Sequence, residues 1–155
     1  PAHDLFVGRA KFGGQAHASG VRVGTRFIAA EETRAHPRYL QQLFAARASD
    51  SVLTEAFWVG WPDAPHRVLR SSLTAAEALP DGPIGEGSHI LTGQPYPVQR
   101  FARGAPHQGM TGEIEAMALY AGESVGSVTR VQPAAEIVRE LSDDAEALLR
   151  RWSVC

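Results

Sequence analysis

The chain has 155 residues, 44% of them hydrophobic, and a formal net charge of −2. This length and composition suit one globular domain over residues 1–155, and the balanced charge gives no reason to expect nucleic acid or an anionic membrane as a partner. No apolar run is long enough to span a bilayer, and no secretory leader is visible, so we expect a cytoplasmic protein. The single cysteine, Cys155, cannot form an intramolecular disulfide, which agrees with a reducing compartment.

The first third of the sequence predicts a strand and a helix. A short apolar run ends in the pair Gly13-Gly14, and residues 21–29 alternate in the manner of a buried strand. Residues 35–48 are expected to form a helix with Pro37 in its first turn. Its apolar stripe consists of Tyr39, Leu40, Leu43 and Phe44.

The remainder divides into two extended runs, a long loop and two helices. The extended runs lie within residues 51–73, and the second run is also a candidate for the start of a helix that reaches Leu79. Residues 80–112 contain seven glycines and five prolines without a sustained period, which predicts a long loop. The last helix should run from Pro133 to Trp152. Its apolar face comprises Ile137, Leu141, Ala145, Leu148 and Trp152.

Gly24-Thr25 interrupts the predicted strand over residues 21–29. A glycine weakens a strand, but it lets a ligand approach the backbone closely. Backbone N–H groups and a threonine hydroxyl are suitable donors for a phosphate group, and Gly13-Gly14 could form a second loop of this kind. The alternative is a bulge in the strand together with an ordinary glycine turn.

Several segments resemble the nitronate monooxygenase family. The segments "GVRVGTRFIAAEE", "AHPRYLQQLFAA" and "SVLTEAF" are similar to the last barrel strand of that family and to the segments that follow it. The segment "YAGESVG" and the final helix resemble the C-terminal part of the family. The resemblance covers residues 20–73 and 113–152, whereas residues 1–19 match poorly.

The resemblance implies an α/β fold that forms the C-terminal part of an FMN-binding (β/α)₈ barrel with C-terminal helices. A complete barrel needs roughly 250 residues, so this chain supplies an incomplete one. The family pattern assigns FMN as cofactor and places its phosphate against Gly13, Gly14, Gly24 and Thr25. Glu123 stands where the family has an amide, and a carboxylate cannot donate the hydrogen bond that an amide donates.

The implied activity is oxidation of nitronates or nitroalkanes, which makes a small molecule the expected partner. The catalytic histidine of the family lies in a region that has no counterpart here, so no catalytic residue is assigned. Alternatives are a non-catalytic remnant or interaction domain, an enzyme similar to the flavin-dependent enoyl reductases, and, with less support, a tautomerase that uses the amine of Pro1. An incomplete barrel should also self-associate or bind a partner that supplies the missing strands.

The histidines mostly favour structural roles. We expect His36 to cap a helix or contact solvent, and His66 to lie in surface structure beside a proline turn. His89 and His107, in the predicted loop, are candidates for contact with a substrate.

Two pairs of side chains, Glu31-Glu32 and Trp58 with Trp61, are expected to have structural roles. Glu31-Glu32 is interpreted as the polar end of a strand in preference to an acid–base pair. Trp58 and Trp61 are expected to pack against the core. No histidine pair has the close spacing of a helical zinc site, so no metal is expected.

Overall fold

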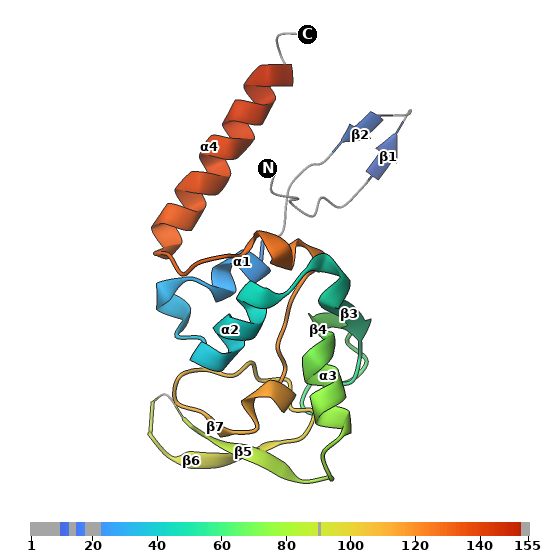
Figure 1. Ribbon diagram of the computed structural model, residues 1–155, viewed down its shortest axis with the longest axis vertical. Coiled ribbons are helices and arrows are strands. Elements are labelled where there is room, and N and C mark those ends of the chain that lie inside the picture. The colour runs from blue at the N-terminus through green and yellow to red at the C-terminus, as the bar shows by residue number, and fades with distance from the viewer. Residues whose placement is uncertain (1–9, 13–14, 18–22, 90, 153–155) are drawn as a thin grey trace.

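The computed structural model describes residues 10–12, 15–17, 23–89 and 91–152. Helices and short strands alternate along these residues, which gives the mixed α/β composition that the sequence predicts (Figure 1). The structure forms three small antiparallel sheets, with strand orders β1-β2, β3-β4 and β6-β5-β7. The strands are β1 (Ala10–Phe12), β2 (Gln15–His17), β3 (Ser51–Thr54), β4 (His66–Leu69), β5 (Pro83–Ser88), β6 (Pro95–Gln99) and β7 (Thr111–Gly112).

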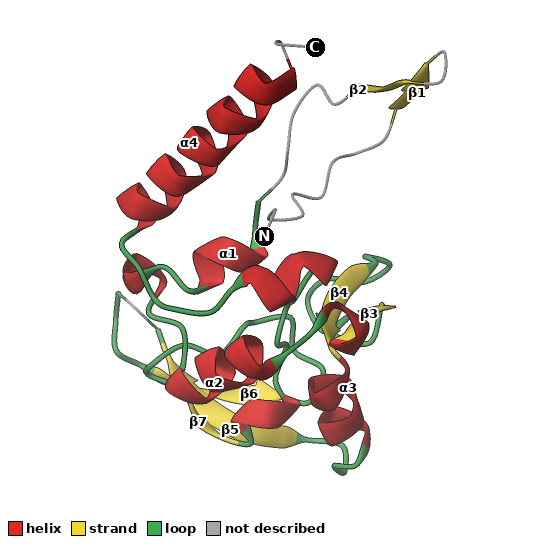
Figure 2. Ribbon diagram, turned by 45° about the horizontal axis from the view of Figure 1, so that its top comes forward, coloured by secondary structure: helices red, strands yellow, loops and turns green. Residues whose placement is uncertain are grey.

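Four α-helices and four 3₁₀ turns make up the helical part of the described chain. The helices are α1 (Thr25–Ile28), α2 (Pro37–Ala45), α3 (Arg70–Glu77) and α4 (Ala134–Trp152). The 3₁₀ turns are η1 (Glu31–Thr33), η2 (Ala48–Asp50), η3 (Ile114–Ala116) and η4 (Glu123–Ser127). Strand β4 leads directly into α3, and the β3–β4 hairpin lies beside that helix (Figure 2).

The strand predicted over residues 21–29 is wrong from Thr25 onward. Thr25–Ile28 form the short helix α1, in which the Phe27 N–H donates to the Gly24 carbonyl at 3.0 Å. Ile28 packs against buried side chains, and Arg26 contacts the segment before α4. These tertiary contacts decide the local conformation, which the alternation of apolar residues alone cannot do. Residues 18–22 lie outside the described chain.

The long loop predicted over residues 80–112 is also wrong, because this segment forms the β6-β5-β7 sheet. Pro95 and Pro97 lie in β6, an edge strand, where the missing N–H of a proline is tolerated. Gly85 of β5 and Gly112 of β7 are paired so closely that a Cβ on Gly112 would lie 2.5 Å from the Cα of Gly85. The glycines and prolines that suggested a loop are therefore adaptations of a tightly paired sheet.

Several predicted elements are confirmed. Helix α2 begins at Pro37, and Tyr39 and Leu43 of its apolar stripe are buried. The two extended runs form the β3–β4 hairpin, and the second run continues into α3. Of the two helices predicted after residue 112, only α4 forms, because residues 113–132 contain the 3₁₀ turns η3 and η4.

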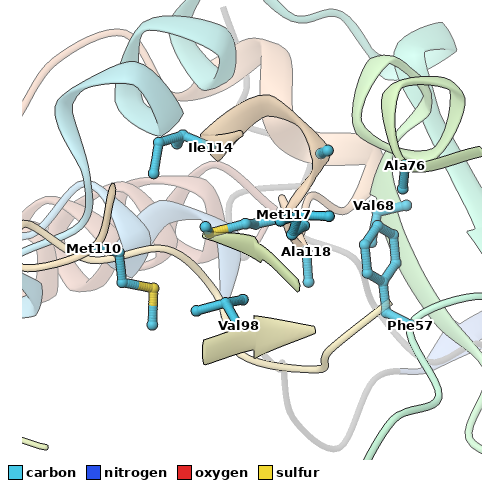
Figure 3. Close-up of a cluster of buried hydrophobic side chains, with 10 residues drawn as sticks. Phe57, Val68, Ala76, Val98, Met110, Ile114, Met117 and Ala118 are labelled. Atoms are coloured by element: carbon cyan, nitrogen blue, oxygen red, sulfur yellow. The ribbon is translucent and has the colours of Figure 1, made fainter. Parts of the chain in front are cut away.

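Two clusters of buried side chains stabilise this arrangement. The first core joins the β6-β5-β7 sheet to α3 and η3, and Figure 3 shows Met117 between Met110 and Ala118 with Val98 below it. The second core lies under α2 and η4, where Leu43, Leu119 and Val125 are completely buried. The backbone from Met117 to Ala121 passes from the first core to the second and so connects them.

Helix α4 extends away from both cores (Figure 1). Ile137 in its first part is fully buried, whereas Val138 and Leu149 are 51% and 70% exposed. The helix therefore attaches through its N-terminal end and leaves apolar side chains uncovered further along. No helix in the described part of the chain is both long enough and apolar enough to cross a membrane.

Candidate cofactor site

The V-G-T segment meets the Y-A-G-E segment at the start of α1. The Thr25 hydroxyl oxygen accepts a hydrogen bond from the Gly122 backbone N–H at 2.9 Å. The two residues are 97 positions apart, and each belongs to a segment that stands out in the sequence. The fold therefore brings these two motifs into one site.

The Y-A-G-E backbone is also bound by hydroxyl groups from two other elements. Tyr39 of α2 donates its hydroxyl hydrogen to the carbonyl of Tyr120 at 2.6 Å. Ser51 of β3 donates in the same way to the carbonyl of Ala121, also at 2.6 Å. Tyr39 and Ser51 are both buried, so these bonds satisfy polar groups that have left water.

Strand β4 contacts the same segment through its backbone and through Arg67. The N–H of Ala121 donates to the Arg67 carbonyl at 3.0 Å, and the N–H of Leu69 donates to Leu119 at 2.8 Å. The Arg67 guanidinium forms an ion pair with Glu123 at 2.6 Å. The carboxylate that replaces the family's amide thus has a partner within the chain.

Sequence reasoning missed the roles of Tyr39, Ser51 and Arg67. Tyr39 was assigned only to an apolar stripe, although a buried tyrosine hydroxyl generally needs a hydrogen-bond partner. Burial raises the pKa of Tyr39, so its hydroxyl group remains protonated and able to donate. No sequence pattern identifies the acceptor, because Tyr120 is 81 residues away.

The backbone at Gly24 is open to the surroundings. A Cβ placed on Gly24 would have no heavy atom within 4 Å, and its φ of −115° is available to any residue. The contacts of the described chain therefore give no reason for a glycine at this position. The Phe27 N–H is bonded to the Gly24 carbonyl, whereas the earlier N–H groups of α1 have no acceptor inside the helix and are available to an anionic group.

Arg26 joins α1 to the segment before α4. Its guanidinium donates to the side-chain oxygen of Gln132 and to the carbonyl of Arg130. Burial lowers the pKa of Arg26, and nearby Glu140 opposes that shift. Gln132 also donates to Glu140 at 2.6 Å, and this hydrogen bond is the main reason that the pKa of Glu140 is lowered. These polar contacts fix α1 beside the start of α4.

Glu31 and Glu32 lie in the 3₁₀ turn η1, and Glu32 contacts the start of α4. Both oxygens of the Glu32 carboxylate accept from the Ala134 N–H, at 3.0 and 3.1 Å. A negative charge at this position satisfies a free N–H at the first turn of α4 and interacts favourably with the helix dipole. Glu32 is therefore a structural cap for α4. The interpretation of Glu31-Glu32 as the polar end of a strand is wrong, because Glu31–Thr33 form the 3₁₀ turn η1 after helix α1.

The histidines divide into three environments. His36 caps α2, since its Nδ1 accepts from the Arg38 N–H at 3.1 Å, as predicted. The prediction for His66 is wrong, because that side chain is buried against aromatic rings instead of lying on the surface. His89 and His107 line one cavity between the β5–β6 connection and residues 104–110.

The two tryptophans are less buried than predicted. Trp61 stacks on the ring of His66 with centroids 5.7 Å apart, but it is 44% exposed. Trp58 is 55% exposed, so the expectation of core packing is wrong for this residue. Across the part of the chain that the structure describes, no three His, Cys, Asp or Glu side chains form a cluster suited to a metal ion.

The geometry places Gly24 and Thr25 together with the Y-A-G-E segment, whereas Gly13 and Gly14 lie outside the described residues. The family model described as nitronate monooxygenase matches residues 15–144. The chain belongs to the nitronate monooxygenase family. The match runs through residues 80–112, which the sequence resemblance had left out, and it begins inside the poorly matching N-terminal part.

Two individual proteins are similar to the chain at lower coverage. The chain is 31% identical over 141 residues to the nitronate monooxygenase npaC of Metarhizium robertsii, a match that spans 85% of this chain and 36% of the relative. A FabK variant from Thermotoga maritima is similar in structure, with a TM-score of 0.48 and 22% identity over 89% of this chain and 37% of that one. The chain thus spans little more than a third of the relatives that it matches.

Proposed function

We propose that this chain is the C-terminal portion of an FMN-dependent oxidoreductase that acts on nitronates or nitroalkanes. The observation that carries the proposal is the hydrogen bond between Thr25 and Gly122, beside the open backbone of Gly24. It joins the two family motifs at the point where the family pattern places the FMN phosphate. Family membership is the second support.

In this proposal the residues around Gly24 bind the phosphate of the cofactor. The N–H groups at the start of α1 donate to the phosphate oxygens, and the hydroxyl hydrogen of Thr25 is free to donate because the oxygen already accepts from Gly122. The family pattern assigns Gly13 and Gly14, which lie outside the described residues, to the same phosphate. FMN, when bound, supplies the redox chemistry, and the protein contributes binding, orientation and electrostatics.

Gly24→Ala tests this assignment with little effect on the fold. The added methyl group meets no atom of the chain, so the thermal unfolding midpoint should not fall. The same methyl group would occupy the space in which the phosphate approaches the backbone, so the Kd for FMN should rise by about tenfold or more, the loss expected for a hydrogen bond to a charged group.

Gly126→Ala is the matched control, since its nearest neighbours would be 3.9 Å from the new Cβ. FMN binding is measured by quenching of flavin fluorescence during titration with each variant. Equal Kd values for Gly24→Ala and the unchanged chain would contradict the phosphate assignment. Thr25→Val should also weaken binding, and Thr25→Ser should restore it.

A non-catalytic interaction domain is the second candidate. The observation that favours it is the exposed apolar surface of α4, where Val138 and Leu149 are 51% and 70% exposed. Oxygen uptake with propionate 3-nitronate and added FMN distinguishes the two. We expect this chain alone to oxidise the nitronate poorly, and to gain activity when it is combined with the upstream portion of the family fold.

Flavin binding is a second criterion. Saturable binding of FMN by the unchanged chain favours the enzyme, and complete absence of FMN binding favours the interaction domain.

A further inference from the structure

A cavity of about 830 Å³ lies between the connection of β5 to β6 and the segment before β7. Its volume is within the range of sites for small organic ligands. The strands β5, β6 and β7 lie at the end of the molecule opposite α4 (Figure 1). The residues that matter for the chemistry of the cavity are Ser88, His89, Tyr96, Ala105, His107 and Met110.

The walls of this cavity combine apolar surface with imidazole groups. Met110 is 6% exposed and also belongs to the first core, so it provides a fixed apolar wall. The rings of His89 and Tyr96 lie 4.9 Å apart, which positions that imidazole against an aromatic neighbour. None of the described residues that line the cavity carries a carboxylate, a guanidinium or an ammonium group. Among these residues an anion would meet no negative side chain.

Local hydrogen bonds determine the protonated nitrogen of His107. Its Nδ1 accepts from the Gly109 N–H at 3.2 Å, so in the neutral ring the proton resides on Nε2. The neighbouring backbone is also fixed, because the His36 N–H donates to Pro106 at 3.1 Å and the Met110 N–H donates to His107 at 2.9 Å. His107 thus presents a donor from a well-supported loop.

The backbone likewise supports His89. Its N–H donates to the Gln94 carbonyl at 2.9 Å, and its carbonyl accepts from Gly93 at 2.8 Å. Ser88, the last residue of β5, lines the same cavity. Its hydroxyl group and the His107 ring both lie near Gly109, at 3.6 Å and 3.4 Å from the position that a Cβ on Gly109 would take. Two imidazoles and a hydroxyl group from two segments of the chain therefore line one cavity.

We propose that this cavity binds a small organic oxyanion, with the anionic head against His89 and His107 and an apolar tail against Met110 and Tyr96. Two imidazole donors suit the two oxygens of a carboxylate or a nitronate, and the apolar wall suits a short alkyl group. The site is distinct from the Gly24–Thr25 region and does not require FMN. The choice of a nitronate as one probe rests on the proposed function, and the carboxylate probe does not.

The test is a titration of the full chain, without FMN, with propionate and separately with the nitronate of 1-nitropropane. Binding is followed through the histidine ring proton signals in NMR spectra. We expect saturable shifts, and we expect His89→Ala and His107→Ala each to raise the Kd by about tenfold or more, the usual loss for a hydrogen bond to a charged group. Gln99→Ala, on the same hairpin but outside the cavity, should bind like the unchanged chain.

His107→Gln keeps an N–H donor and should lose less affinity than His107→Ala, which separates a role in binding from a role in folding. It also keeps the test decisive if His107→Ala does not fold. Binding of propionate alone would support the oxyanion site while separating it from nitronate oxidation. The proposal is overturned if neither anion binds saturably, or if the histidine variants bind as well as Gln99→Ala. Because FMN is absent, a failure here leaves the result for Gly24→Ala unaffected.

Discussion

A single hydroxyl group, that of Tyr39, links helix α2 to the segment that follows the first core. The Tyr39 side chain is buried, and its hydroxyl group donates to the carbonyl of Tyr120. Burial raises the pKa of both tyrosines, and the hydroxyl of Tyr120 donates in turn to the carbonyl of Arg103 at 2.7 Å. Stability at this point depends on both phenols remaining protonated.

Tyr39→Phe should destabilise the fold by about 0.5–1.5 kcal/mol, because it removes the hydrogen bond that the Tyr39 hydroxyl donates to the Tyr120 carbonyl. Urea denaturation measures this loss. Tyr96→Phe is the control, since Tyr96 is only partly buried and lies in strand β6, away from helix α2. Equal unfolding free energies for the two variants would contradict the role assigned to the Tyr39 hydroxyl.

The contribution of the Tyr39 hydroxyl to stability should depend on pH in the alkaline range. The pKa of Tyr39 is raised in the folded state, whereas in the unfolded chain a tyrosine ionises near pH 10. The unfolded state therefore loses protons first, and stability decreases as pH rises above about 10. We expect Tyr39→Phe to lose less stability than the unchanged chain between about pH 9 and 11, measured by denaturant unfolding at each pH. A parallel loss in both proteins would show that Tyr39 does not contribute.

The pairing of strands β5 and β7 depends on the two glycines Gly85 and Gly112, which lie opposite each other. Gly112 has a φ of +100°, and a Cβ on it would lie 2.5 Å from the carbonyl oxygen of Ile84. Gly112→Ala should therefore cost at least the roughly 1–3 kcal/mol of a residue in a sparsely populated conformation, with steric overlap added. Gly104→Ala, where the added methyl group meets nothing within 4 Å, is the matched control in thermal unfolding. Equal midpoints would mean that β7 is not required for the sheet.

The attachment of α4 depends on Glu32 in the same way. Glu32→Ala removes the acceptor for the Ala134 N–H and should destabilise the first turn of α4 by about 0.5–2 kcal/mol, the usual value of a helix cap. Amide hydrogen exchange in α4 should become faster in this variant. Glu31→Ala, one position earlier, should leave exchange in α4 unchanged. Similar exchange in both variants would remove the capping role from Glu32.

The elements that local sequence determines were predicted well. Helices α2 and α4 have apolar stripes, a proline at the start and regular spacing, and these features do not depend on distant partners. The strand prediction fails over Thr25–Ile28, where contacts of Arg26 with residues near 130 accompany a short helix. The β6-β5-β7 sheet was missed because its glycines and prolines resemble those of a loop.

The candidate site was predictable only where a motif marks it. Gly24 and Thr25 stand out within an apolar run, and the structure places Thr25 against Gly122 of the second motif. Tyr39 and Ser51 do not stand out, since their acceptors lie 81 and 70 residues away. The sequence could not predict the cavity with His89 and His107, because the segments that line it are separated in the chain. It could only mark both histidines as candidates for contact with a substrate.

At the scale of the whole molecule, the uncovered face of α4 is the main irregularity. Val138, Leu148 and Leu149 are 51%, 43% and 70% exposed, and apolar side chains gathered along one helix generally mark a surface that another chain or segment covers. In the proposed function that cover is the portion of the family fold upstream of this chain. In its absence, we expect the chain to self-associate through α4.

Light scattering over a dilution series tests this expectation. The apparent molar mass of the unchanged chain should increase with concentration, and the double substitution Leu148→Glu with Leu149→Glu should reduce that increase. Leu53→Glu changes a side chain that is 60% exposed but distant from α4, and it should have no such effect. A constant monomer mass, with one cooperative unfolding transition at every concentration, would instead show a self-sufficient single domain.

The way in which Tyr120–Glu123 is bound also bears on how the chain folds. Bonds to Gly122, Tyr120 and Ala121 close loops of 97, 81 and 70 residues, so the contacts that unite the two cores are among the most distant in the sequence. Contacts of this kind make folding slow, because the entropy of loop closure is lost before the contacts form. During synthesis, α1, α2 and β3 emerge from the ribosome long before residues 120–123 do. Until those residues follow, the hydroxyl groups of Tyr39 and Ser51 have no native acceptor, and the nascent chain remains exposed to chaperones and proteases.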